Sequence, residues 1–135
     1  MGVAPVKVYL DSCIVIYLVE EHPRFSSIVR NAFATSEGRQ FCISPLVELE
    51  CLVGPLRVEN TPLIQRYKIF FQHQIILDIE SSVYRQAAEL RARHGLKTPD
   101  ALHLAVAHHY DCRELWTNDN RLNTAAASKA VNLFF

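Results

Sequence analysis

The chain has 135 residues, half of them hydrophobic, and carries 14 acidic and 14 basic side chains. This length suits one domain with a single core, and the hydrophobic fraction argues against disorder. A formal net charge of zero excludes a strongly basic chain that binds nucleic acid non-specifically, but it leaves room for a local basic patch.

Short apolar runs alternate with longer helical patterns along the chain. Strands are predicted, in order, at residues 6–10, 40–43, 75–79, 114–117 and 131–135. Strands separated by helices indicate right-handed crossovers and a parallel sheet covered on both faces. The predicted fold class is therefore α/β: a three-layer α/β/α sandwich with a central, mainly parallel sheet of four to five strands.

Proline and glycine mark the expected helix boundaries. Pairs typical of a helix start are Ser44-Pro45, Thr61-Pro62 and Thr98-Pro99, and Gly95 is typical of a helix end. Gly54-Pro55 predicts a break or a kink in the helix that begins after Ser44.

The cysteines and the first residues bear on the compartment. No CxxC pair or zinc-ligand spacing is formed by Cys13, Cys42, Cys51 and Cys112, so we expect small buried side chains in a reducing environment. The N-terminal stretch lacks a basic region followed by a long apolar run, and the early apolar run 13–19 is too short to cross a bilayer. A cytoplasmic protein is the resulting expectation.

Acidic residues follow the predicted strands. Asp11 comes after the first strand and Asp119 after the fourth, Glu48 and Glu50 lie on the helix after the second, and Asp100 lies in the first turn of another helix. Parallel α/β sheets bind ligands outside the carboxyl ends of their strands. Singly, Asp100 could serve only the helix dipole, a gain of about 0.3–1 kcal/mol. Together these carboxylates predict a site for a hard cation, Mg²⁺ or Mn²⁺.

Several neighbouring residues allow two interpretations. Glu48 and Glu50 point about 160° apart on a helix, so only one of them can face the site. We expect His103 to be packed or hydrogen-bonded, because Mg²⁺ prefers oxygen ligands. Arg93 and Lys97 precede Asp100 and are candidates for phosphate contacts, with a solvated helix face as the alternative. Tyr9, Tyr17 and Trp116 are expected in the core.

Other α/β enzymes fit less well. An aspartate-nucleophile phosphatase would need an acid two residues after Asp11, where Cys13 stands. The four glycines form no glycine-rich phosphate loop, and no GxSxG elbow is present.

The chain resembles the PIN-domain ribonucleases, and more closely the VapC toxins of type II toxin–antitoxin pairs. The resemblance covers nearly the whole chain and implies a single PIN-like domain over residues 1–135. It rests on four ordered blocks: "YLDSCIVIYLV", "ISPLVELECLVGPLR", "AAELRARHGLKTPDALHLAVA" and "LWTNDNRL".

The resemblance also implies a site and an activity. Its metal-binding acidic quartet falls on Asp11, Glu50, Asp100 and Asp119. The family's glutamate follows the serine that ends the second strand by six residues, which selects Glu50 and assigns Glu48 to the solvent face. The residues that would orient the carboxylates are Ser12, Ser44, Thr117 and Asn118.

The implied activity is Mg²⁺-dependent (or Mn²⁺-dependent) hydrolysis of RNA by an endoribonuclease. The resemblance further implies the role of a toxin inhibited by a cognate antitoxin, and a homodimer within a larger toxin–antitoxin complex. The alternative is a catalytically silent module that binds a partner protein through its acidic site.

Overall fold

A parallel sheet forms the centre of the molecule. The computed structural model describes residues 4–134, and within them five strands pair in the order β3-β2-β1-β4-β5. The strands are β1 (Val6–Leu10), β2 (Arg39–Ile43), β3 (Ile75–Ile76), β4 (Glu114–Trp116) and β5 (Ala130–Val131). Every pair is parallel, so the carboxyl ends of all five strands lie at one edge of the sheet.

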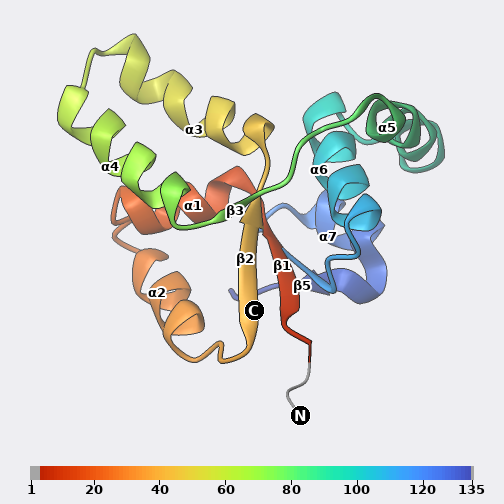
Figure 1. The fold of residues 1–135 in the computed structure, drawn as a ribbon, viewed down its shortest axis with the longest axis horizontal. Helices are drawn as coiled ribbons and strands as arrows, with labels where there is room; N and C mark the ends of the chain where they lie inside the picture. The colour runs from red at the N-terminus through yellow and green to blue at the C-terminus, as the bar shows by residue number, and fades with distance from the viewer. Residues whose placement is uncertain (1–3, 135) are drawn as a thin grey trace.

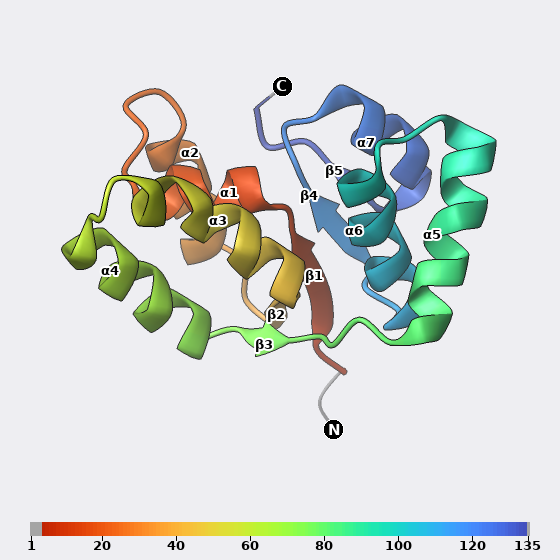
Figure 2. The same cartoon turned by 90° about the horizontal axis from the view of Figure 1, so that it is seen from above.

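Helices cover both faces of this sheet, as Figures 1 and 2 show. One face carries α1 (Ser12–Val19), α2 (Ser26–Ala34), α3 (Pro45–Arg57) and α4 (Thr61–Gln72). The other carries α5 (Ser81–His94), α6 (Thr98–His109) and α7 (Asn120–Ala126), which is followed by a 3₁₀ turn at Ala127–Lys129. The predicted three-layer α/β/α sandwich is therefore confirmed.

The outer strands are shorter than predicted. The strand expected at 75–79 pairs only at Ile75–Ile76, and the one expected at 131–135 pairs at Ala130–Val131. Phe135, the last residue of that prediction, lies outside the described residues. Both strands lie at the edges of the sheet, where a single neighbour supplies hydrogen bonds.

Helix α3 differs from its prediction at Gly54-Pro55. It begins after Ser44 with Pro45 in its first turn, as expected, but it continues through Pro55 to Arg57. The proline lies in the last turn, where losing one backbone hydrogen bond costs least, and its ring is buried. Gly95 ends α5 in the left-handed conformation, as predicted.

Helix α6 is the most deeply buried helix. All residues from Ala101 to Ala107 are buried. The small alanines let α6 lie close to the sheet and to α5, so the first turn of α6 is held at a fixed place beside the strand ends.

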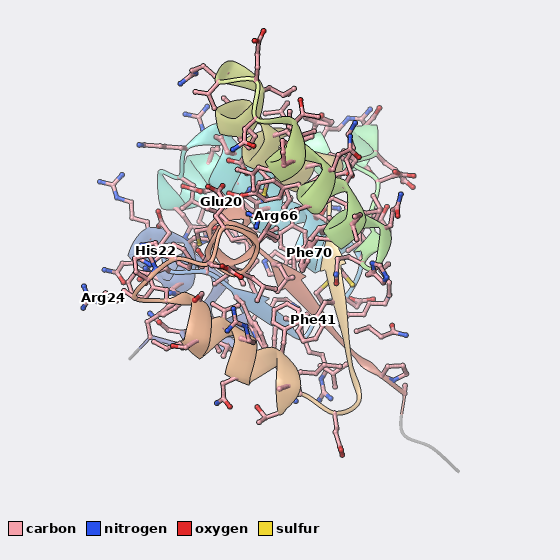
Figure 3. All side chains as sticks on the ribbon, turned by 90° about the vertical axis from the view of Figure 1, so that its left-hand side faces the viewer. Glu20, His22, Arg24, Phe41, Arg66 and Phe70 are labelled. Carbon is pink, nitrogen blue, oxygen red and sulfur yellow. The ribbon has the colours of Figure 1, made fainter. Side chains whose placement is uncertain are left out.

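Aromatic packing anchors the opposite face, between α2, α4 and the sheet (Figure 3). The rings of Phe33 and Phe41 stack with centroids 4.1 Å apart, and Trp116 meets Phe41 edge-on at 5.3 Å. Trp116 is only 2% exposed, which confirms its predicted place in the core. No helix within residues 4–134 has the length and apolar character needed to cross a membrane.

Candidate metal centre

Asp11 is the most enclosed of the acidic residues. It follows β1 directly and caps α1, with its Oδ1 accepting a hydrogen bond from the Ser12 amide at 2.7 Å. Its Oδ2 accepts from the Thr117 hydroxyl, which follows β4, at 2.6 Å. The residue is 7% exposed. A buried carboxylate with a partner on each oxygen has a defined orientation.

Glu50 reaches the same place from helix α3. It lies on α3, and its Oε1 is 2.5 Å from Nε2 of His103 on α6. The same nitrogen is 3.5 Å from Oδ1 of Asp11. One ligand atom from each of these three residues lies within 4.8 Å of the other two, a spacing that could hold a metal ion.

Asp100 and Asp119 lie farther out. Asp100 is half-buried in the first turn of α6, and Asp119 is exposed and caps α7, accepting from the Leu122 amide at 3.0 Å. Burial raises the pKa of Asp100, and the nearby charges of Asp119, Asp11 and Glu50 raise it further, while His103 lowers it. The charges of Asp119, Asp11 and Glu50 thus lie near enough to act on the Asp100 carboxyl.

A hollow of about 720 Å³ opens over three of these acids, Glu50, Asp100 and Asp119. The described residues that line it are Glu50, Lys97, Pro99, Asp100, Asp119, Asn120 and Arg121. Two basic side chains, Lys97 and Arg121, therefore border the acidic residues of this hollow. This arrangement suits a polyanionic substrate that binds next to metal ions.

Only one of the two basic residues predicted for phosphate contact borders this hollow. Lys97 does, whereas Arg93 lines a separate hollow beside Glu89 and His108. The second basic residue that borders the hollow is Arg121, which was not predicted to contact phosphate. Its position two residues after Asp119, in the first turn of a helix that starts at this edge of the sheet, was the available signal.

Of the two glutamates on α3, Glu50 faces the hollow and Glu48 is not among its described lining residues. Glu48 was assigned to the solvent face, but it is half-buried, and this burial raises the pKa of its carboxyl.

The four residues expected to orient the carboxylates divide into two groups. Ser12 and Thr117 contact Asp11 directly, and the Thr117 hydroxyl also accepts from the Asp119 amide at 3.0 Å. Ser44 instead bonds the Tyr9 hydroxyl at 2.8 Å, and the Asn118 side chain donates to the Tyr17 hydroxyl at 3.2 Å.

His103 and Tyr9 form polar contacts inside the core. Nδ1 of His103 lies 2.6 Å from the Tyr9 hydroxyl, and both residues have no exposed surface. Burial lowers the pKa of His103, but the hydrogen bond to Glu50 and the charges of Asp11, Glu50 and Asp100 more than offset it, so the net pKa is raised. The interpretation of His103 as hydrogen-bonded agrees with these contacts. Tyr9 was expected to be only a core residue.

The sulfur atoms are not arranged as metal ligands. All four cysteines are free thiols, and three of them are buried as predicted. Cys13 is partly buried, with its Sγ 3.6 Å from Oδ2 of Asp11, and burial raises its pKa to about 12, so it stays protonated. The donors available in the site are therefore carboxylate oxygens with one imidazole beside them, a set that fits Mg²⁺ or Mn²⁺.

The chain is thus an α/β protein with a parallel sheet and acidic residues near its strand ends, and comparison with known families narrows this class. The PIN domain family matches residues 8–128, and the chain belongs to this family. The predicted resemblance to PIN domains is thereby confirmed. No curated protein matches the chain in a sequence comparison.

Solved structures share the fold over most of the chain. A protein from a toxin–antitoxin complex of Klebsiella pneumoniae is 24% identical with a TM-score of 0.78, and the match covers 94% of this chain and 98% of that one. A chain of VapBC2 from Rickettsia felis, bound to a promoter DNA fragment, is 19% identical with a TM-score of 0.77 over 94% and 98%. VapC20 of Mycobacterium tuberculosis, a toxin that cleaves the sarcin-ricin loop, is 15% identical with a TM-score of 0.75 over 87% and 94%. At these identities the likeness establishes the fold.

Proposed function

We propose that this chain is a Mg²⁺-dependent or Mn²⁺-dependent endoribonuclease of the VapC type, acting as one domain over residues 1–135. The observation that carries the proposal is a chain of proximities among four carboxylates: Glu50, Asp100 and Asp119 line one hollow, and Asp11 and Glu50 offer ligand atoms within 4.8 Å of one another. Carboxylates that only cap helices gain nothing from lying close together, because their mutual repulsion costs free energy.

The proposed metal ligands are Asp11, Glu50, Asp100 and Asp119. A divalent ion held by them would supply Lewis acidity toward a phosphodiester and toward the attacking water. Oxygen donors at this density are what Mg²⁺ and Mn²⁺ require.

The other residues of the site have distinct tasks in this proposal. Thr117 and the Ser12 amide hold both oxygens of Asp11, so that this carboxylate keeps one orientation. Lys97 and Arg121 border the hollow and would bind phosphates on either side of the scissile bond. Such contacts align the backbone of a single strand without selecting its bases.

RNA is the proposed substrate because the sequence blocks resemble ribonucleases and because the fold is shared with a toxin that cleaves the sarcin-ricin loop. The proposed setting is the cytoplasm.

An antitoxin is the proposed partner, together with a second copy of the chain. Structural relatives from Klebsiella and Rickettsia were solved as toxin–antitoxin assemblies. Helix α3, which carries Glu50, also exposes an apolar stripe of Leu49, Val53 and Leu56, exposed by 59%, 42% and 57%. An apolar face beside the acids offers a place where a bound protein could cover the hollow.

The test is RNA cleavage by the purified chain, with Mg²⁺ or Mn²⁺ and with EDTA. We expect cutting that requires the metal and is lost in Asp11→Asn and Asp100→Asn, while circular dichroism shows that both variants stay folded. Cleavage that persists in EDTA would contradict the proposal. A wild-type chain that never cuts RNA but binds a protein through its acidic site would instead support the catalytically silent module.

A further inference from the structure

A line of polar groups crosses the core behind the acidic hollow. The Ser44 hydroxyl lies 2.8 Å from the Tyr9 hydroxyl, which lies 2.6 Å from Nδ1 of His103, and Nε2 of His103 lies 2.5 Å from Glu50. Ser44, Tyr9 and His103 have no exposed surface. The line ends at the one member that reaches the hollow, Glu50.

The chemistry of these groups gives the hydrogen bonds a direction. An ionised carboxylate can only accept, so Nε2 of His103 donates to Glu50. In the neutral imidazole, Nδ1 then accepts from the Tyr9 hydroxyl, and the Tyr9 oxygen can accept from Ser44. The Glu50 carboxylate therefore requires the N–H at Nε2, and the Tyr9 hydroxyl, which can donate or accept, hydrogen-bonds Nδ1 on the other side of the ring.

The members of this line come from the same segments as the proposed ligands. Tyr9 precedes Asp11 by two residues on β1, and His103 follows Asp100 by three on α6. Tyr9 also pairs with neighbours on both sides, facing Cys42 of β2 and Leu115 of β4 in the sheet register. The hydrogen bonds thus tie the central strand to the two helices that carry Glu50 and Asp100.

Packing alone does not account for these residues. Buried hydroxyl and imidazole groups lose hydration that their hydrogen bonds only restore, so apolar side chains of similar size would fill the same space at no net loss. The polar character of these side chains matters where the line ends, because there His103 orients the partly exposed carboxylate of Glu50. Nε2 of His103 also lies 3.5 Å from Oδ1 of Asp11, so one imidazole nitrogen is close to the carboxylates of both Asp11 and Glu50.

We propose that Tyr9 and His103 are positioning residues that hold the Glu50 carboxylate in the orientation that binds a divalent cation. This inference rests on the proposed metal site and adds two residues that do not themselves bind the ion. Removing such an outer hydrogen-bond partner typically weakens metal affinity by about 10- to 100-fold.

The test measures Mn²⁺ affinity by isothermal titration calorimetry on the whole chain. We expect Tyr9→Phe and His103→Leu to bind Mn²⁺ about 10- to 100-fold more weakly than the wild type. His103→Gln keeps an N–H donor near the position of Nε2 and should recover most of the affinity.

Tyr67→Phe is the matched control. Tyr67 is also a fully buried tyrosine whose hydroxyl donates to a carboxylate, that of Glu20, on the face shown in Figure 3. Its loss should lower thermal stability but leave Mn²⁺ affinity unchanged, which separates positioning from the general cost of removing a buried hydroxyl.

A spectroscopic measurement on the wild type avoids any effect of mutation on folding. In ¹⁵N-labelled protein, addition of Mg²⁺ should shift the ring signals of His103 and leave those of His108 unchanged. Equal Mn²⁺ affinity in wild type and Tyr9→Phe, or His103 signals that ignore Mg²⁺ in a chain that binds it, would overturn the inference alone. Failure of the wild type to bind either ion would overturn the proposed metal site as well.

Discussion

The four acids of the site form two pairs with different supports. The inner pair, Asp11 and Glu50, is held by side chains from other segments: Thr117 on Asp11 and His103 on Glu50. The outer pair, Asp100 and Asp119, lies at helix starts and borders the hollow. Asp11 is 7% exposed, whereas Asp119 belongs to the exposed residues.

This difference separates two ways of placing a charge. The inner carboxylates depend on hydrogen bonds between residues far apart in the chain, so their orientation changes when one partner is lost. The outer carboxylates are placed by local backbone geometry and the helix dipole, so neighbours affect them mainly through charge. Variants of the two pairs should therefore fail in different ways.

The largest effect is expected for the inner pair itself. Asp11→Asn keeps a side-chain acceptor for the Ser12 amide but removes the negative charge and the oxygen that Thr117 contacts. Because loss of a ligand exceeds loss of an outer partner, RNA cleavage should fall by at least about 100-fold. Single-turnover cleavage rates measure this. A rate near that of the wild type would show that Asp11 is only a helix cap.

A smaller loss is expected from Thr117→Val, which leaves all four acids in place. Thr117 donates to Asp11 and accepts from the Asp119 amide, so it links the inner pair to the outer one. We expect cleavage and Mn²⁺ affinity to fall by about 10- to 100-fold. Thr124→Val is the control, since its hydroxyl bonds only its own helix at Asn120. Equal losses of cleavage and Mn²⁺ affinity in the two variants would show that Thr117 has no special role in the site.

The basic border of the hollow should matter less. Lys97→Ala and Arg121→Ala should weaken RNA binding mainly at low salt, each lowering the slope of log K against log salt by about 0.7. Arg93→Ala, on the separate hollow, should leave the slope unchanged. Fluorescence anisotropy with a labelled single strand at several salt concentrations measures these slopes, and a changed slope in Arg93→Ala would show that RNA extends over α5.

The smallest effect concerns stability and has opposite signs within the outer pair. The pKa of Asp100 is raised above its ordinary 3.8 by burial and by Asp119, Asp11 and Glu50. The stability that this raised pKa represents is present below pH 3.8 and is lost as pH rises through the folded-state pKa. In EDTA at neutral pH, Asp100→Asn should therefore raise the unfolding temperature slightly while abolishing cleavage.

Asp119→Ala should do the opposite to stability. It removes the side-chain cap of α7, a loss of about 0.5–2 kcal/mol. Thermal melts of both variants in EDTA, at neutral pH and near pH 3.5, measure the contrast. A lower unfolding temperature for Asp100→Asn at neutral pH would show that repulsion does not dominate at this residue.

Local sequence patterns were sufficient for much of this protein. Apolar runs and helix boundaries predicted the order of strands and helices, because each depends on neighbouring residues. Asp11 and Asp119 follow strands, and Asp100 follows a helix-starting proline, so the rule that parallel strands end at one edge predicted that they would lie near one another.

Tertiary structure decided the details that depend on orientation and distance. Gly54-Pro55 did not end α3: Pro55 is accommodated, buried, within the last turn of the helix. Arg121 rather than Arg93 borders the hollow beside Lys97, because α7 starts at this edge of the sheet.

The same distinction applies to the polar line behind the site. Spacing alone left Glu48 and Glu50 open, since the choice depends on how α3 is rotated against its neighbours. Tyr9 and His103 are 94 positions apart, and neither looks functional by itself. Only when β1 and α6 pack together does a core tyrosine hydrogen-bond the core histidine that contacts Glu50. The sequence by itself therefore determined which residues carry charge at the strand ends, and the tertiary structure decided which hydrogen bonds orient them.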